Sequence, residues 1–363
     1  MRAPFRSVST MSSFPQNQEA ISRGAESSAR FTDQLGRMLR DLRISVTDRC
    51  NFRCAYCMPR DVFGADHQFM PKNELLSYEE ISRVARIFAS AGVRKLRLTG
   101  GEPLLRAGLE TLVGMLAPIP GIEDLALTTN GVLLARQASA LRGAGLRRVT
   151  VSLDAMEPAL FRAMSSSSVD VLAVFEGIEA ARLSGFSPVK INMVVRRGVN
   201  EREILPMARH FSGEGFVLRF IEYMDVGTTN GWRRSEVVSL QEILEVLEAE
   251  FGLEEMMPVQ SGEPARRYRL IKTGGEVGVI ASVTEPFCRG CTRARLTASG
   301  QLHNCLFGPG ALDLKALIRG GSSDGEILQR LSDVWRNRND RYSELRSVAI
   351  AHNSRAEMSV LGG

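Results

Sequence analysis

The sequence predicts an α/β fold, with a partial (β/α)6 barrel of the TIM type followed by a smaller C-terminal α+β region. Six short runs rich in β-branched and apolar residues recur between residues 42 and 224, and amphipathic stretches with a helical period separate them. This alternation predicts a parallel sheet with helices outside it. Polar and reactive residues follow the ends of several runs, which favours a barrel. The alternation stops after about residue 240, where we expect the barrel to end.

The individual barrel elements follow from the same pattern. The helical stretches are clearest at 78–92 and 174–185, where Gly185 stands at a C-cap position. A doubly wound sheet would show the same alternation, but a barrel collects the residues at its strand ends on one mouth. The predicted strands are 42–47, 93–99, 124–129, 147–153, 189–195 and 217–224, and the residues at or after their ends are Cys50, Gly100, Gly101, Glu102, Thr129, Asn130, Ser152, Asp154 and Met224.

Three parts of the chain differ in pattern. Residues 1–30 are rich in Ser, Ala and Arg without an apolar period, which predicts a disordered extension. An organellar transit peptide is the alternative, and Glu19 and Glu26 count against it. Residues 31–240 are predicted to form the barrel. Residues 241–363 are predicted to form a C-terminal domain, with helices over 239–252, 311–321 and 324–338 and strands over 266–272 and 275–282.

Composition narrows the class of protein. The 363 residues are 44% hydrophobic, enough for a sizeable core. No run approaches the roughly 18 apolar residues of a membrane span, and no secretory core is present, so we expect a cytoplasmic protein. The net charge of +5 comes mainly from Arg, which suits contacts to an anionic small molecule. The basic residues are scattered, which disfavours a nucleic-acid surface.

The six cysteines fall into two groups of three, separated by about 230 residues without any cysteine. Three disulfides would also use six cysteines, but a chain of this size without a secretory signal has little need of them. Two metal sites with three ligands each are the simpler interpretation. The groups are Cys50, Cys54 and Cys57, and then Cys288, Cys291 and Cys305.

The first group, CNFRCAYC, places three thiols on one short loop. Such a set suits three corners of a 4Fe-4S cluster and leaves one iron open, where the amino and carboxylate groups of a methionine can bind. Zinc is the alternative, but a zinc site requires four ligands, and His67 is the only histidine nearby. The segment LTGGEPLLR follows about 43 residues later. Its Gly100 and Gly101 allow close approach to a ligand, and either Glu102 or exposed backbone carbonyls can accept hydrogen bonds from an ammonium group.

These motifs resemble the radical S-adenosylmethionine (SAM) superfamily. Further segments narrow the resemblance to the GTP 3',8-cyclase family of molybdenum cofactor biosynthesis, and it runs from about residue 38 to the last residue. The segments are TTNG (128–131), VSLDA (151–155), RFIEYMDVG (219–227), FCRGCTRARLTASGQLHNCLF (287–307) and the terminal GlyGly.

The resemblance implies a lyase. In that family SAM is cleaved to methionine and a 5'-deoxyadenosyl radical, which takes the 3' hydrogen of GTP, and the substrate radical then adds to C8 to give 3',8-cyclo-7,8-dihydro-GTP. No conventional acid or base is expected in the first step. The residues implied to bind SAM are Tyr56, Gly101, Ser152 and Met224. Taken alone, Ser152 would be interpreted as a turn residue and Met224 as a core residue.

The second cysteine group again leaves an iron open. An electron relay prefers four protein ligands, whereas a substrate anchor needs the open iron, and the resemblance implies that this cluster binds the guanine base. Arg43 and Arg97 lie inside apolar strands, where an unpaired charge is costly, so a bound anion is expected there. The resemblance assigns to GTP the residues Arg43, Arg97, Thr128, Lys190, Arg293, Ala294 and Arg295, with Arg293 and Arg295 as positioning residues.

The resemblance also implies partners and a role for the tail. A flavodoxin or ferredoxin would supply electrons, cyclic pyranopterin monophosphate synthase would follow in the pathway, and a homodimer is compatible with the family. Gly362 and Gly363 match a tail that enters the active site. Two alternatives stand beside this hypothesis. One is another radical SAM enzyme with an auxiliary 4Fe-4S cluster, and the other is a non-enzymatic iron-sulfur or zinc protein that binds nucleotides or RNA.

Overall fold

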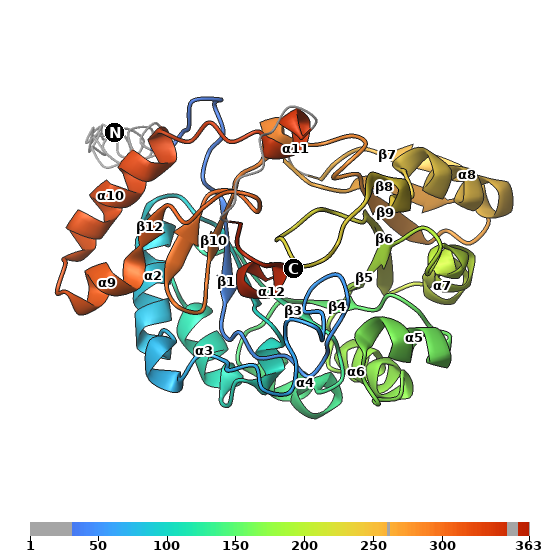
Figure 1. The fold of residues 1–363 in the computed structure, drawn as a ribbon, viewed down its shortest axis with the longest axis horizontal. Coiled ribbons are helices and arrows are strands. Elements are labelled where there is room, and N and C mark those ends of the chain that lie inside the picture. Colours follow the sequence, from blue (N-terminus) through green and yellow to red (C-terminus); the bar gives the residue numbers. More distant parts are fainter. Residues whose placement is uncertain (1–30, 260–261, 347–354, 363) are drawn as a thin grey trace, which may run out of the picture.

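The computed structural model describes residues 31–259, 262–346 and 355–362, so the predicted extension 1–30 lies outside the described residues. Within them, twelve strands form one curved sheet in the order β12-β11-β10-β1-β2-β3-β4-β5-β6-β9-β8-β7 (Figure 1). The strands are β1 (Asp41–Ser45), β2 (Lys95–Thr99), β3 (Asp124–Thr129), β4 (Arg148–Ser152), β5 (Val189–Val195), β6 (Phe216–Glu222), β7 (Leu253–Met256), β8 (Arg266–Leu270), β9 (Glu276–Ile280), β10 (Arg293–Leu296), β11 (Gln301–His303) and β12 (Leu312–Asp313).

The first six strands confirm the predicted partial barrel. They lie in sequence order, and each pairs in parallel with the next. A doubly wound sheet would reverse its strand order at the middle, and this sheet does not. Each strand begins and ends within two residues of its prediction, because alternate buried residues make the strand period visible in the sequence.

Helices cover the outer face of the barrel strands (Figure 1). Sequence-encoded caps start some of them: Ser77 accepts a hydrogen bond from the N–H of Glu80, whose carboxylate accepts one from the N–H of Ser77. The helices of this half are α2 (Tyr78–Ser90), α3 (Leu109–Leu116), α4 (Leu134–Gly143), α5 (Pro158–Ser165), α6 (Leu172–Leu183) and α7 (Ile204–Phe211), and those of the C-terminal part are α8 (Leu240–Phe251), α9 (Leu314–Arg319), α10 (Asp324–Arg336), α11 (Tyr342–Leu345) and α12 (Met358–Leu361). None of these helices is long and apolar enough to cross a membrane.

The strands after residue 240 extend the barrel sheet at both of its edges. β10 pairs in parallel with β1, with Leu42 opposite Ala294. At the other edge β9 pairs in parallel with β6, with Leu218 opposite Val277. The strands of the C-terminal part therefore belong to the same sheet as the barrel strands. A domain boundary near residue 240 stays a prediction.

Alternate residues of the strands face two different environments. In β1, Leu42 and Ile44 are fully buried, whereas Asp41 and Arg43 are only partly buried and line an internal cavity. β2 repeats this pattern with the sequence KLRLT. The apolar set belongs to one core that extends from the barrel to Trp335 of α10. The polar side chains of these strands face the inside of the barrel.

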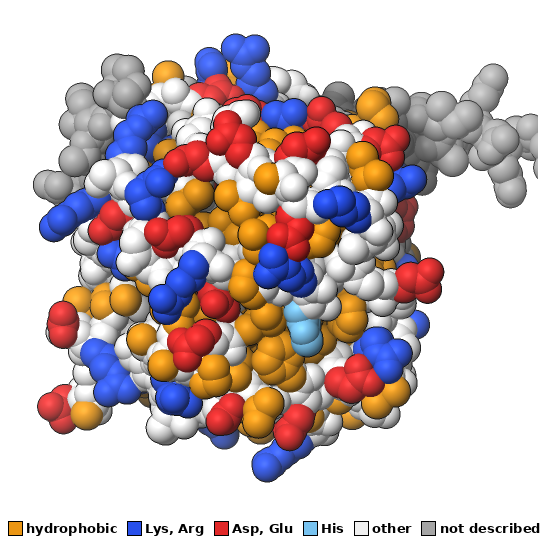
Figure 2. Space-filling model, turned by 90° about the vertical axis from the view of Figure 1, so that its right-hand side faces the viewer, with side chains coloured by type: hydrophobic (Ala, Val, Ile, Leu, Met, Phe, Trp, Pro, Cys, Tyr) orange, Lys and Arg blue, Asp and Glu red, His pale blue; other side chains and the backbone are white. Residues whose placement is uncertain are grey.

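The outer face over α7 and α8 carries charges of both signs, interspersed around a band of apolar side chains (Figure 2). Arg209 of α7 forms an ion pair with Glu250 of α8, and Arg197 forms one with Glu242. Such exposed pairs contribute little to stability. The charges of this face thus have partners of the opposite sign, unlike the cations of the cavity described below.

A buried carboxylate joins the barrel to the C-terminal part. Glu222, at the end of β6, is fully buried and accepts hydrogen bonds from the backbone N–H groups of Leu240 (2.9 Å), Val283 (2.7 Å) and Thr284 (2.9 Å). The Thr284 hydroxyl also donates to it. One side chain thus fixes both the start of α8 and the loop that leads to the second cysteine group.

Replacing Glu222 should therefore destabilise the fold. Glu222→Ala leaves three backbone N–H groups without an acceptor, and we expect the free energy of unfolding to fall by about 3 to 5 kcal/mol. Urea unfolding of the metal-free protein, followed by circular dichroism, measures this. Glu248→Ala on the exposed side of α8 is the matched control and should change stability by less than about 0.5 kcal/mol. Equal midpoints for the two variants would contradict the proposed joint.

Candidate active site

One cavity of about 880 Å³ occupies the inside of the barrel and is lined by all six cysteines. Its wall includes the ends of β1 to β6, the strand β10 and the C-terminal residues Met358 and Gly362. The structure thereby brings together two cysteine groups that are far apart in the sequence. It also places the C-terminal helix α12 inside the curve of the sheet (Figure 1).

The first cysteine group lies on the loop after β1, and arginine holds the backbone of that loop. Arg53 donates from Nη1 to the carbonyl oxygens of Cys50 and Phe52 (2.8 Å each) and from Nε to that of Phe63 (2.8 Å). Burial, with a contribution from Glu102, raises the pKa of Cys50 to about 11. Burial also raises the pKa of Cys54 and of Cys57. In the metal-free protein these thiols are therefore protonated at neutral pH.

Tyr56 lies between two of these cysteines and is held by Asp154. Its hydroxyl donates to Oδ2 of Asp154 (2.6 Å), and the other carboxylate oxygen accepts from the N–H of Val194 (2.8 Å). Burial raises the pKa of Asp154 to about 6, although both hydrogen bonds favour the ionised form. The ring of Tyr56 thus has one fixed orientation at the cavity wall.

The glycines of the GGEP segment allow close contact with another part of the main chain, in addition to the predicted close approach to a ligand. A side chain at Gly100 or Gly101 would collide with the backbone of the segment Thr47–Arg49, so the absence of Cβ lets two pieces of main chain touch. Gly101 also lines the cavity, as predicted.

Glu102 lines the cavity, but protein donors surround its carboxylate, so its role as an acceptor for a ligand ammonium group stays a prediction. Its carboxylate is buried and accepts from the N–H groups of Leu104 (3.0 Å) and Asn130 (2.7 Å) and from the Thr129 hydroxyl (2.7 Å). These protein donors occupy both oxygens. Burial nevertheless raises the pKa of Glu102 to about 7. Its role here is to tie β2 to the end of β3.

The second cysteine group sits among arginines. Arg293 donates from Nη2 to Sγ of Cys291 (3.6 Å). Burial opposes ionisation of Cys291, but the guanidiniums of Arg293 and Arg338 outweigh it and lower the pKa of this thiol to about 5. Burial raises the pKa of Cys305. Cys291 thus lies in electrostatic surroundings opposite to those of the first cysteine group.

Both groups fit iron-sulfur ligation by the chemistry of their donors. All six thiols are free, and all are partly exposed to the cavity. Among the described residues no three Cys, His, Asp or Glu side chains converge as the ligands of one metal ion would. Iron-sulfur ligation does not require such convergence, because each cysteine of a 4Fe-4S cluster binds its own iron.

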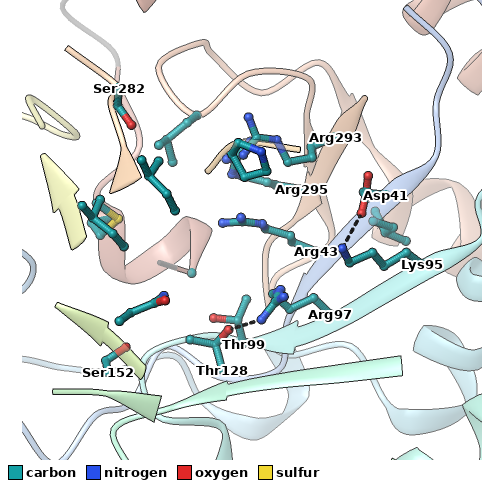
Figure 3. Close-up of a pocket in the computed structure, with 18 of the residues that line it drawn as sticks. Asp41, Arg43, Lys95, Arg97, Thr99, Thr128, Ser152, Ser282, Arg293 and Arg295 are labelled. Carbon is teal, nitrogen blue, oxygen red and sulfur yellow. Dashed lines mark hydrogen bonds and ion pairs between the residues drawn. The ribbon is translucent and has the colours of Figure 1, made fainter. Parts of the chain in front are cut away.

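Between the cysteine groups the strands present a row of cations. Arg43 of β1 lies directly opposite Arg97 of β2 on one side and Arg295 of β10 on the other. Figure 3 shows these side chains, with Arg293, pointing into the same space. Arg97 donates to the hydroxyl of Thr128 (2.8 Å), whereas Lys95 is drawn to Asp41 (3.5 Å) and Asp124 (3.9 Å) at the rim.

Apart from the exposed Arg40, six of the cavity cations form no ion pair with any described residue. Burial and the neighbouring cations lower the pKa of Arg97 to about 10, that of Arg219 to about 9 and that of Lys190 to about 7. The Nε atoms of Arg219, Arg293 and Arg295 are buried without a hydrogen-bond partner. The cavity is thus built for a multiply charged anion. The six cations are Arg43, Arg97, Lys190, Arg219, Arg293 and Arg295.

Arg219 lines the cavity but was not predicted from the sequence. Ala294 was predicted to bind GTP but does not line the cavity. Arg219 lies on β6 opposite Asn192 of β5, and its strand parity with Lys190 was the signal that could have revealed it. Ala294 is fully buried and lies between Arg293 and Arg295, where alternate side chains of β10 face opposite sides. Its methyl group belongs to the core, so a side-chain contact with a ligand in the cavity is excluded.

The remaining predicted positions line the cavity. They are Arg43, Tyr56, Arg97, Gly101, Thr128, Ser152, Lys190, Met224, Arg293 and Arg295 together with the six cysteines. Ser152 lies at the end of β4, next to Asn192 in register (Figure 3). Met224 packs against a small apolar cluster formed by Val226, Phe307 and Met358. The structure therefore places these residues at the cavity, as expected from the sequence. The role of each residue stays a prediction.

The C-terminal tail reaches the cavity through several contacts. The carbonyl oxygen of Val360 accepts from the Ser45 hydroxyl (2.9 Å), and Gly362 lies against Thr99. Glu357 accepts from the N–H of Thr228 (2.9 Å) and from the hydroxyl of Thr229 (2.8 Å). Gly363 lies outside the described residues.

Comparisons with known proteins agree with this geometry. Residues 44–211 match the model of the radical SAM superfamily, and residues 216–344 match the model described as Molybdenum Cofactor Synthesis C. The chain is 52% identical over 320 residues to the GTP 3',8-cyclase of Acidothermus cellulolyticus, a match that covers 87% of this chain and 88% of that protein. The chain belongs to the GTP 3',8-cyclase family. A GTP 3',8-cyclase of Staphylococcus epidermidis is 46% identical over 335 residues, which is 91% of this chain and 98% of that relative.

Solved structures support the fold. Streptococcus suis SuiB bound to S-adenosylmethionine aligns with a TM-score of 0.57 at 14% identity, covering 91% of this chain and 72% of that chain. At this identity the likeness concerns the fold alone. Membership of the radical SAM superfamily implies a 4Fe-4S cluster and SAM.

The opposite surroundings of the two cysteine groups predict different thiol reactivities. In the metal-free protein at pH 7, Cys291 should be thiolate, whereas only about one Cys50 in ten thousand should be. The lower intrinsic nucleophilicity of a low-pKa thiolate offsets part of this difference, so we expect iodoacetamide to modify Cys291 about tenfold faster than Cys50. Anaerobic labelling with peptide mass spectrometry measures both rates. Arg293→Gln should shift the pH profile of Cys291 labelling to higher pH and leave that of Cys50 unchanged, and equal parent rates would contradict the assignment.

Proposed function

We propose that this cavity holds SAM and GTP together and converts GTP to 3',8-cyclo-7,8-dihydro-GTP, the first step of molybdenum cofactor biosynthesis. The observation that carries the proposal is the combination, in one cavity, of two free cysteine triads with six cations that lack acidic partners. A nucleoside triphosphate carries close to four negative charges at neutral pH, and its base and phosphates lie at opposite ends. The site offers both thiols and cations in the same cavity.

The first triad, Cys50, Cys54 and Cys57, would hold the 4Fe-4S cluster common to the superfamily. With SAM bound to it, this centre would supply a 5'-deoxyadenosyl radical that takes the 3' hydrogen of GTP. The chain's own residues orient SAM: Tyr56, fixed by Asp154, and Gly101 lie beside the triad, while Ser152 at the end of β4 offers a hydroxyl to a carboxylate or ribose. Met224 can pack on the adenine.

The second triad, Cys288, Cys291 and Cys305, would hold a second 4Fe-4S cluster whose open iron binds the guanine base. Arg293 and Arg295 extend from the same strand toward the cavity and would position the nucleotide. Arg43, Arg97, Lys190 and Thr128 would bind the triphosphate, and Arg219 joins this set because its Nε is buried without a partner. Binding energy at the phosphates, remote from the reacting carbon, holds the ribose in place for hydrogen transfer.

Enclosure protects a radical reaction from stray hydrogen donors and water. The cavity lies inside the sheet, and the tail residues Val360 to Gly362 close part of it through Ser45 and Thr99. We therefore assign to the tail the exclusion of solvent from the space between the two triads.

The direct test is anaerobic reconstitution followed by incubation with dithionite, SAM and GTP. We expect about eight iron atoms per chain, 5'-deoxyadenosine and a cyclised GTP product. Cleavage of SAM without consumption of GTP would refute the substrate assignment, and iron near four per chain would refute the second cluster. Cys288→Ala should keep the first cluster and its slow SAM cleavage but abolish productive GTP binding.

Lys190 predicts a pH dependence of GTP binding. Because its pKa is about 7 in the free protein, Lys190 is mostly neutral at pH 8, and a bound triphosphate raises that pKa. GTP binding at pH 8 should therefore take up close to one proton, and the affinity contributed by Lys190 should fall as pH rises from about 7 to 9. Calorimetry in two buffers of different ionisation enthalpy measures the uptake.

A matched pair of variants isolates this effect. Lys190→Gln should bind GTP more weakly and remove the proton uptake, whereas Lys272→Gln, on an exposed turn, should behave as the parent. Uptake that persists in Lys190→Gln would assign the titration to another group.

The remaining expectations follow from the family. We propose a cytoplasmic protein that receives electrons from a flavodoxin or ferredoxin and passes its product to cyclic pyranopterin monophosphate synthase. A homodimer is also compatible with the family.

A further inference from the structure

Two buried arginines hold the backbone of the second cysteine loop from outside the cavity. Arg37 donates from Nη1 to the carbonyl oxygen of Cys288 (2.9 Å), and Arg338 donates from Nη1 to that of Cys291 (2.8 Å). Each arginine is 4% exposed. Both cysteines line the cavity, but neither arginine does. The arginines thus contact the main chain of the loop while its thiols face the ligand space.

Asp33 joins the two guanidiniums. Its Oδ2 accepts from Nε of Arg37 (2.6 Å) and from Nη1 of Arg338 (3.3 Å). Its Oδ1 accepts from the backbone N–H groups of Leu35 and Arg37 (2.9 Å each). The carboxylate is therefore fully used, and one anion fixes two cations. We call Asp33, Arg37 and Arg338 the Asp33 network.

Aromatic and backbone contacts fix the network further. Trp335 donates from Nε1 to the carbonyl oxygen of Arg37 (3.0 Å), and the Arg338 guanidinium lies over its ring, 4.5 Å from the centroid. Arg37 also donates to the carbonyl oxygen of Asp340 (2.7 Å). Each guanidinium is therefore held by several partners from different parts of the chain, which restricts its rotamer.

The segment that carries Asp33 is docked on the same region. The N–H of Arg40 donates to the carbonyl oxygen of Thr292 (3.0 Å), directly after Cys291, and the N–H of Gln34 donates to that of Arg338 (3.2 Å). Residues 31–40 precede both stretches that match family models. This segment nevertheless forms part of the support of the second cysteine group.

The placement of these charges favours a role at the cysteines over a role in stability alone. Burying two guanidiniums is costly, and an apolar cluster would stabilise this region at lower cost. The carbonyl groups of two of the three cysteines are the groups that the arginines bind. Asp33 and Asp340, whose carboxylate lies 3.4 Å from Nε of Arg338, balance the two cations, so the arginines act on the loop through their hydrogen bonds to its carbonyl groups.

We infer that Arg37 and Arg338, joined by Asp33, are positioning residues that hold the backbone of residues 288–291 so that the second triad faces the cavity cations. This inference depends on the proposed function, in which that triad holds a cluster and anchors the guanine base. The arginines act through the loop and do not touch the nucleotide.

Amide hydrogen exchange of the metal-free protein tests the support itself. In Arg338→Gln, the peptide that covers residues 288–292 should exchange about tenfold faster or more than in the parent, because a buried charged hydrogen bond to the loop is lost. Arg336→Gln, at the exposed last residue of α10 and two residues before Arg338, is the matched control and should leave the exchange unchanged. Equal exchange in the two variants would overturn the inference. If Arg338→Gln fails to fold, Arg37→Lys and Arg338→Lys, which keep the charge, serve in its place with the same expectation at reduced size.

Iron analysis then separates this inference from the proposed function. In a parent whose Cys50, Cys54 and Cys57 are all replaced by Ala, the second triad should still bind about four iron atoms. Adding Arg338→Gln should lower that iron content at least twofold, or shift the electron paramagnetic resonance spectrum of the reduced cluster and weaken GTP binding about tenfold. Iron, spectrum and affinity equal to those with Arg336→Gln would overturn the inference. A triple-Ala parent that binds no iron would instead refute the second cluster, while faster exchange in Arg338→Gln would still establish the support of the loop.

Discussion

Repulsion among cations on neighbouring strands is the constraint around which this molecule is organised. Arg295, Arg43 and Arg97 lie side by side across three paired strands, and their apolar neighbours on the other face lock the register. The sheet cannot relieve the repulsion by slipping one residue, because that would turn the arginines into the core and Leu42 into the cavity. An anion is the remaining way to neutralise them. Stability and ligand binding are therefore coupled in this fold, since the core that fixes the strands also forces the charges together.

The same coupling explains the contrast between the two cysteine groups. Near the first, carboxylates such as Glu102 and Asp154 and deep burial disfavour additional negative charge. Near the second, Arg293 and Arg338 favour it. The potential in this cavity is thus more negative at the first cysteine group and more positive at Cys291 of the second. Such a field attracts an anionic substrate toward the second group and the neighbouring cations before any specific contact is made.

The sequence predicted the barrel well because its evidence is local. Alternating residues in runs such as KLRLT show both the strand and the side that faces the cavity. The pairing of β10 with β1 could not be predicted in this way, since it joins residues about 250 positions apart and β10 has only four residues. For the same reason Asp33 and Arg37 appeared as ordinary charged residues of a leading segment. The partners of Glu102 could not be predicted either, since Thr129 and Asn130 come from the end of the next strand.

The parallel pairing of β1 with β10 affects how the chain can fold while the ribosome is synthesising it. One edge of β1 has no neighbour until Arg293 to Leu296 have been synthesised, which at typical elongation rates takes about 10 to 50 seconds after β1 itself. During this interval a half-formed barrel exposes an unpaired parallel edge, the kind of surface that associates with other chains. The loop of the first cysteine group already exists by then, while the second group does not. The topology therefore imposes an order in time, in which the surroundings of the first cysteine group can fold before those of the second.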